Sequence, residues 1–247
     1  MENKITKNKA VGVLLFLIAI AGIIILICRI AFYQYEYHPQ NAPVDYGRFN
    51  VLSYFTIQSN FVCCLYFLMV ALGIFGNQKA QKIGFSPTVG ALITLYVLVA
   101  GVTYNMGFVV KMSPPLTYDT PYHAFISCMQ MFYHVLMPVV AVSLWCFPLK
   151  NEKLGIKCIL SSGIYPLAYS VFSIIRGALF EPTYYPYPFY NPAWIWQTFM
   201  GDKPMNLAVA YLLIAVLLAF GIALFIGIEA LLVLIHNKRV RQSIHKA

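Results

Sequence analysis

Apolar residues in this chain come in six long blocks separated by short polar segments. The blocks cover about 11–32, 51–75, 88–110, 122–147, 154–180 and 205–235. A helix needs about 20 mostly apolar residues to cross a hydrocarbon core about 30 Å thick. Long uninterrupted blocks, rather than narrow apolar stripes, are typical of helices surrounded by lipid. The pattern predicts an all-α integral membrane protein with six transmembrane helices in a single domain, residues 1–247.

The basic residues predict the orientation of these six helices. Only 10% of the residues are charged, and 17 are lysine or arginine. Twelve of these precede the first block, follow the last, or lie in the second and fourth loops: Lys4, Lys7, Lys9, Lys79, Lys82, Lys150, Lys153, Lys157, Lys238, Arg239, Arg241 and Lys246. By the positive-inside rule, both termini are expected in the cytoplasm. The net charge of +9 is then explained mostly by basic residues at the cytoplasmic ends of the helices, and no nucleic-acid partner is expected.

The segment 181–204, on the outer side, is rich in proline and aromatic residues. Proline disfavours a regular helix, and so many aromatic side chains are costly to leave in water. We therefore expect this loop to fold over the outer mouth of the bundle. An interfacial belt of aromatic anchors, which needs no ligand, is the alternative.

Polar residues recur on single faces of four of the helices. At about 100° per residue, the second span carries Ser53, Thr56 and Asn60 on one side. The other three stripes are Tyr104 and Asn105, then Gln130 and His134, and finally Tyr169, Ser173 and Arg176. Lipid cannot satisfy such groups, so the stripes should face one another or a water-containing cavity. Hydrogen bonds that merely join helices would explain the same stripes.

Two of these residues suggest chemistry. A mostly neutral imidazole at His134 would leave one nitrogen free to accept a proton. Arg176 stays charged, and a guanidinium just below the outer surface suits the carboxylate or phosphate of a ligand. Its side chain could instead extend to lipid head groups. No acidic residue lies in the middle of the membrane to orient the histidine, because Glu229 is near the cytoplasmic end.

Four short motifs carry a resemblance to a known family. They are 53–60 (SYFTIQSN), His134 before Pro138, 165–169 (YPLAY) and 185–189 (YPYPF). Together they resemble bacterial relatives of the androgen-induced-gene and ADTRP membrane proteins. The resemblance implies a multipass hydrolase of the bacterial plasma membrane that cleaves fatty acid esters of hydroxy fatty acids, with Thr56 as nucleophile and His134 as base. The animal proteins carry a further histidine near the catalytic one, where this chain offers Gln130 and Tyr133.

A threonine nucleophile requires a base within about 3 Å, and the oxyanion requires donors. Asn60, Tyr169 and Tyr104 are candidate donors. At a rise of 1.5 Å per residue, Thr56 lies about 8 Å below the outer end of its helix. His134 lies about 18 Å down if its helix begins at residue 122, and about 10 Å down if it begins near 127. Both starts are open, and only the later one brings the pair into register.

The leading hypothesis is therefore hydrolysis of a lipid ester by Thr56 and His134 in a polar cavity in the outer half. The residues expected to bind the amphiphilic substrate are Ser53, Asn60, Tyr104, Asn105, Gln130, Tyr169, Ser173, Arg176 and Tyr187. A non-catalytic protein that binds or carries a lipid or small molecule is the alternative, and a purely structural subunit is a third. Neither the histidines nor the cysteines have metal-ligand spacing, so no metal or cofactor is expected.

Overall fold

The computed structural model describes residues 6, 8–34, 45–109, 113, 115–147, 149–179 and 183–245. Within these residues the chain is helical and contains no strand. The α-helices are α1 (Lys9–Ala31), α2 (Phe55–Ile74), α3 (Gln78–Gly84), α4 (Pro87–Val109), α5 (Pro121–Met131), α6 (Met137–Trp145), α7 (Ile156–Ser161), α8 (Ile164–Leu179), α9 (Pro192–Met200) and α10 (Leu207–His245). Shorter turns are the 3₁₀ helices η2 (Arg48–Ser53) and η4 (Pro188–Tyr190) and the π-helical turn η3 (Phe132–Leu136).

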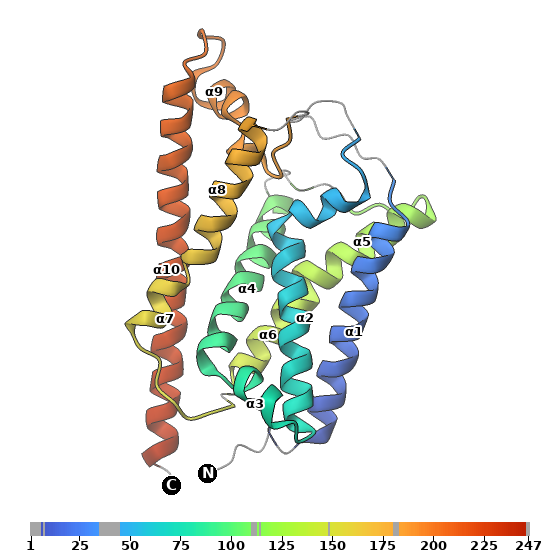
Figure 1. Ribbon diagram of the computed structural model, residues 1–247, viewed down its shortest axis with the longest axis vertical. Coiled ribbons are helices and arrows are strands. Elements are labelled where there is room, and N and C mark those ends of the chain that lie inside the picture. Colours follow the sequence, from blue (N-terminus) through green and yellow to red (C-terminus); the bar gives the residue numbers. More distant parts are fainter. Residues whose placement is uncertain are drawn as a thin grey trace.

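The helices form two groups that stand side by side (Figure 1). The first is a bundle of α1, α2, α4 and the continuous α5–η3–α6, in which α2 packs against both α1 and α4. The second contains α10 with α7, α8 and α9, and it joins the bundle mainly where α10 packs on α4. Helix α1 begins and α10 ends at the bottom of the figure. We call this the lower end and the opposite end the upper end.

Six helical segments are long and apolar enough to cross a membrane, as the sequence predicts. They are Lys9–Ala31, Phe55–Ile74, Pro87–Gly107, Pro121–Trp145, Ile156–Leu179 and Leu207–Gln242. Many of their large apolar side chains point outward, including Leu17 on α1 and Phe220 on α10. Such surfaces suit lipid contact, and the finding supports an integral membrane protein.

The second and fourth spans differ from their predicted boundaries. Helix α2 begins at Phe55, because Arg48–Ser53 forms the separate turn η2 and Tyr54 is extended. Ser53 therefore does not share a helical face with Thr56 and Asn60, which corrects that prediction. In the fourth span, the Thr120 hydroxyl accepts from the His123 N–H and caps a helix that begins at Pro121. The earlier of the two predicted starts is thus the one adopted.

The segment 181–204 contains more regular structure than the sequence predicts. Helix α9 occupies Pro192–Met200 and begins with a proline, a position where a missing N–H costs nothing. The Asn191 side chain accepts from the N–H groups of Ala193 and Trp194 and caps this helix. The expectation that proline keeps this segment free of regular helix is therefore wrong for 192–200. Tyr184, Tyr185 and Tyr190, which precede α9, are buried, and Tyr185 and Tyr190 belong to a cluster with Phe55 of α2 and Tyr169 of α8.

Candidate functional site

Arg176 is the cation at the centre of the upper polar cluster. It lies near the end of α8, half-buried, and its guanidinium donates to the Ser53 hydroxyl and, over 2.9 Å, to Asn50 Oδ1. The guanidinium carbon lies 4.7 Å from the centre of the Tyr184 ring. In the described part of the chain, no carboxylate pairs with Arg176. Its described partners are all neutral, so no negative charge among the described residues offsets the guanidinium.

Asp45, the acidic residue that precedes η2, accepts hydrogen bonds from Tyr33 and Gly47 and not from Arg176. One carboxylate oxygen of Asp45 accepts from the Tyr33 hydroxyl over 2.6 Å and from the Gly47 N–H over 2.7 Å. These two donors, the phenol first, hold the pKa of Asp45 below its usual value. Gly47 has φ of +76°, a backbone conformation that favours glycine. Asp45 thus stays ionised and fixes the start of η2, the turn that carries Asn50 and Ser53 to Arg176.

Tyr169 holds the backbone between η2 and α2. Its hydroxyl donates to the Ser53 carbonyl over 2.7 Å and accepts from the Phe55 N–H over 3.1 Å. Because Tyr54 is extended, neither backbone group has a helical partner, and the phenol supplies both bonds. Tyr169, predicted to bind substrate, therefore positions Ser53 from within the protein. Ser173, one turn further along α8, is fully buried.

Thr56 lies at the second position of α2, beside the Tyr187 hydroxyl. Its carbonyl accepts from the Ser59 hydroxyl and from Asn60 Nδ2, over 3.1 and 2.9 Å. The Thr56 hydroxyl and the first N–H groups of α2 lie near the Tyr187 hydroxyl and act to lower its pKa. Burial outweighs them and raises the pKa of Tyr187. Tyr187 is therefore a neutral phenol, and Thr56 has no general base among these contacts.

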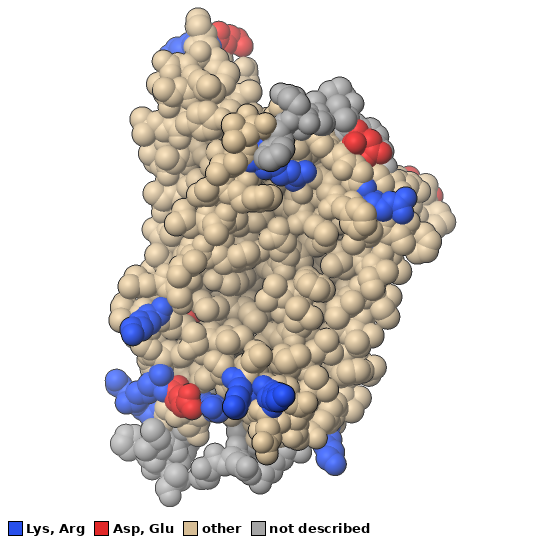
Figure 2. All heavy atoms as spheres, in the orientation of Figure 1, with Lys and Arg blue, Asp and Glu red and all other residues tan. Residues whose placement is uncertain are grey.

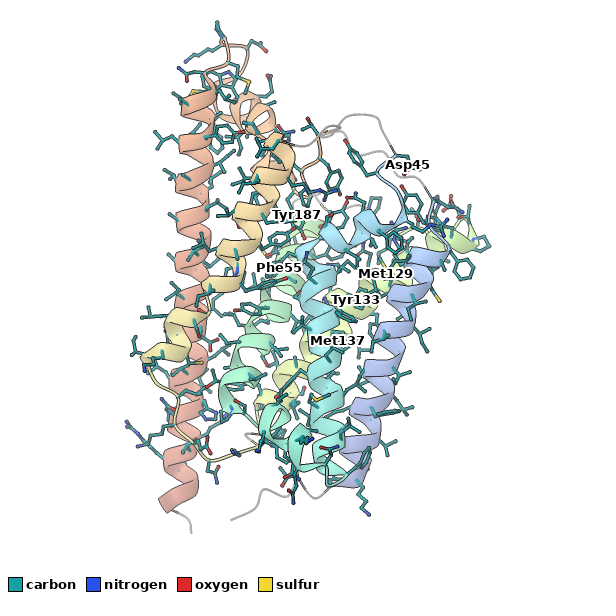
Figure 3. The ribbon with its side chains drawn as sticks, viewed as in Figure 1. Asp45, Phe55, Met129, Tyr133, Met137 and Tyr187 are labelled. Atoms are coloured by element: carbon teal, nitrogen blue, oxygen red, sulfur yellow. The ribbon has the colours of Figure 1, made fainter. Side chains whose placement is uncertain are left out.

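Aromatic rings fill the space between α2 and α8 below the Arg176 cluster. Phe55 is stacked on Tyr165, with ring centres 5.2 Å apart, and Tyr187 lies close by (Figure 3). The Tyr165 hydroxyl donates to Gln58 Oε1 over 2.7 Å, and Gln58 Nε2 donates to the Leu52 carbonyl. Gln58 thus belongs to this site, although counting along the helix places it off the Thr56 face. The Thr-Ile-Gln-Ser-Asn motif was its only signal in the sequence.

His134 lies in a second polar group, in the π-helical turn between α5 and α6. It is 7% exposed, and its ring is stacked on Tyr104 of α4, with centres 3.7 Å apart. Its Nδ1 lies 3.0 Å from the Gln130 carbonyl. A carbonyl only accepts, so Nδ1 carries the proton and Nε2 keeps its lone pair. Among the described residues, Nε2 has no hydrogen-bond partner.

Asn105 supports the backbone at the same place. Its Nδ2 donates to the His134 carbonyl over 3.0 Å and to the Gly101 carbonyl of its own helix over 2.8 Å. The His134 carbonyl lacks its usual helical donor, because Pro138, four residues later, has no N–H. Asn105, predicted to bind substrate, therefore satisfies a carbonyl that proline leaves free.

The structure does not bring Thr56 and His134 together. No hydrogen bond joins them, and Thr56 contacts Tyr187 whereas His134 contacts Tyr104. Tyr133, next to His134 in the chain, donates to the Gly22 carbonyl of α1 over 2.7 Å. Gly22 packs against Cys64 of α2, so His134 lies near the level of Cys64. Cys64 is about two turns, or about 12 Å, beyond Thr56 along α2. This separation follows from the early start of the fourth span.

The predicted residues therefore form two groups. Ser53, Thr56, Tyr169, Ser173, Arg176 and Tyr187 lie around the upper end of α2 and α8, whereas Tyr104, Asn105, Gln130 and His134 lie between α4 and the fourth span. Asn60 is fully buried, and its Oδ1 has no partner among the described residues. No group of three or more metal-ligating side chains occurs in the described ranges. Comparisons with protein-family models, curated proteins and solved structures find no match to this chain.

Proposed function

We propose that this membrane protein binds the anionic head group of an amphiphilic lipid at Arg176. The observation that carries the proposal is a half-buried guanidinium whose described partners are all neutral. Guanidinium groups bind carboxylate and phosphate through paired hydrogen bonds. The aromatic rings beneath it offer apolar surface to the chain that follows such a head group.

The position of Arg176 argues against an arginine that simply reaches for lipid head groups. An extended arginine would leave its guanidinium in the interface. Here Asn50 and Ser53, both in the 3₁₀ turn that precedes α2, accept hydrogen bonds from it, and the Tyr184 ring lies close by. Such fixed donors reduce the loss of side-chain entropy when a ligand binds.

We propose that the upper end faces the outside of the cell. A band of Lys and Arg side chains crosses the lower end, whereas the broad middle of this face carries few charges (Figure 2). Exposed lysines of the lower end include Lys79, Lys82, Lys150 and Lys153. The positive-inside rule supports a cytoplasmic lower end and cytoplasmic termini. The resemblance of the motifs extends this proposal to a bacterial plasma membrane.

Ligand titration of purified protein in a non-ionic detergent tests the binding proposal. The probes are dodecyl phosphate and dodecanoate, whose head groups represent the two anions that Arg176 could bind. Hydrogen bonds to charged groups contribute about 1.5–3 kcal/mol, so Arg176→Gln should weaken binding about tenfold or more. The affinity of Arg176→Lys should lie between those of the wild-type protein and Arg176→Gln, because lysine keeps the charge but cannot form the paired hydrogen bonds.

Arg48→Gln is the matched control, since Arg48 is an exposed arginine at the start of η2, the turn that carries Asn50 and Ser53. Its loss removes an equal charge but, as for most exposed charges, should change the affinity by no more than about twofold. Equal weakening by both substitutions would mean that only the overall charge matters, and the proposed site would be wrong.

Hydrolysis of a lipid ester by Thr56 and His134 is the second proposal. The free Nε2 of a buried, neutral imidazole favours it, because this nitrogen can accept a proton. The separation of the two residues stands against a direct pair and would require the fourth span to move along α2. Turnover of long-chain esters that is lost in both Thr56→Ala and His134→Ala, with folding unchanged, would support catalysis. Turnover that survives either substitution would exclude this pair.

A further inference from the structure

A carboxyl group is buried in the lower half of the protein, away from the Arg176 site. Glu229 of α10 is 0% exposed. It bonds to Cys158 of α7, which belongs to an apolar cluster shared by α4, α6, α7 and α10. The other members of this cluster include Ala91 and Leu95 of α4 and Leu232 of α10. Of the eight acidic residues in the chain, Glu229 alone falls within an apolar block.

The described part of the chain offers this carboxyl few partners. The Cys158 Sγ lies 3.2 Å from Oε1 and donates to it, whereas Oε2 has no hydrogen-bond partner among the described residues. The titratable groups that face it are the Cys158 thiol from α7 and the Tyr96 phenol from α4. Both are neutral in an apolar setting.

The basic groups closest to Glu229 along the two helices are engaged or exposed. Lys157, next to Cys158, is exposed. On α10, the His236 imidazole bonds to the Glu152 carbonyl over 2.7 Å, and Arg239 is directed at Cys146. No described cation therefore compensates a charge on Glu229.

An isolated carboxylate in such surroundings is very costly, and a buried acid without a cation takes up a proton instead. We propose that Glu229 is a proton-binding site, in which the neutral acid and the Cys158 thiol join α10 to α7 and α4. Loss of the proton would place a charge in the apolar cluster, which would require water or a cation to enter between these helices.

The proton-binding site adjoins the aromatic rings of the upper half. Phe225, one turn above Glu229 on α10, packs against Tyr96 of α4 and Phe55 at the start of α2, with ring centres 6.2 and 6.0 Å apart. A shift of α10 after proton release would therefore reach the first turn of α2. Proton binding at Glu229 thus provides a route by which the lower half could alter the upper site.

Infrared spectroscopy at neutral pH, in a detergent without ester groups, tests the proposal. Aspartate and glutamate with ordinary pKa values near 4 are ionised under these conditions. The wild-type protein should show the carbonyl stretching band of a protonated carboxylic acid. The band should disappear in Glu229→Gln and remain in Glu152→Gln, which alters an exposed carboxyl of the same end. A folded wild-type protein without this band would overturn the proposal, whatever the variants do.

Thermal unfolding gives a second readout that separates a proton from a bound cation. Glutamine has the shape of the protonated acid and no charge, so Glu229→Gln should unfold at the wild-type temperature, while Glu229→Lys should unfold well below it. A large loss of stability in Glu229→Gln, or wild-type stability that depends on sodium or potassium concentration, would show that the carboxyl is ionised. The proposal would then be wrong. Neither readout depends on ligand binding at Arg176.

Discussion

A single hydroxyl group, that of Tyr169, stabilises the interruption between the helical turn η2 and helix α2 at the upper end. The sequence between Arg48 and Asn60 contains no proline or glycine that would separate η2 from α2. The Tyr169 hydroxyl, from a helix more than 100 residues later, bonds to both sides of the break. Helical periodicity therefore placed Ser53 on the wrong face. The arginine itself could be predicted, because an ionisable residue near a membrane surface stands out in any hydropathy pattern.

Replacing Tyr169 with phenylalanine tests the role of this hydroxyl. The substitution keeps the ring but leaves the Ser53 carbonyl and the Phe55 N–H without a donor and an acceptor. We expect the free energy of unfolding to fall by about 1–3 kcal/mol, measured by unfolding in detergent. Tyr118→Phe, at an exposed tyrosine, should have almost no effect. An unchanged stability in Tyr169→Phe would mean that the break is held by other contacts.

The shape of the fourth span depends on Pro138 and on the Asn105 side chain that replaces the hydrogen bond lost to this proline. The sequence predicts one continuous helix for the fourth span. In the structure this span starts early, and His134 does not reach Thr56. The π-helical turn ends at Leu136, two residues before Pro138, whose missing N–H leaves the His134 carbonyl without its helical donor. Asn105 then supplies the bond from the neighbouring helix. The sequence shows both residues, but their coupling depends on the packing of α4 against the fourth span.

This coupling predicts non-additive effects on stability. Asn105→Ala should lower the free energy of unfolding by about 1–3 kcal/mol, because it leaves a buried carbonyl unsatisfied. In a Pro138→Ala background, the restored N–H can bond to the His134 carbonyl. Asn105→Ala should then lower the free energy of unfolding much less. A double-mutant cycle of unfolding free energies measures the difference. Simple additivity would contradict this account of Asn105.

Hydropathy predicted the whole molecule better than it predicted the site. All six spans lie near their predicted positions, because lipid requires long apolar helices wherever they pack. The division into a bundle and an α7–α10 group could not be read from the sequence, since side-chain contacts between distant helices decide it. That division places Gln58 of the bundle against Tyr165 of α8, whereas the early start of the fourth span separates His134 from Thr56. The polar residues consequently form an arginine-centred upper site and a second group around His134.

The most direct test of the central claim varies the charge of the ligand together with Arg176. Dodecanoate and the neutral dodecanamide are titrated into the wild-type protein and into Arg176→Gln, in the same detergent. The wild-type protein should prefer the carboxylate by about tenfold or more, equivalent to at least about 1.4 kcal/mol. Arg176→Gln should bind both ligands with similar affinity. An equal preference for the carboxylate in both proteins would contradict an anion-binding site at Arg176.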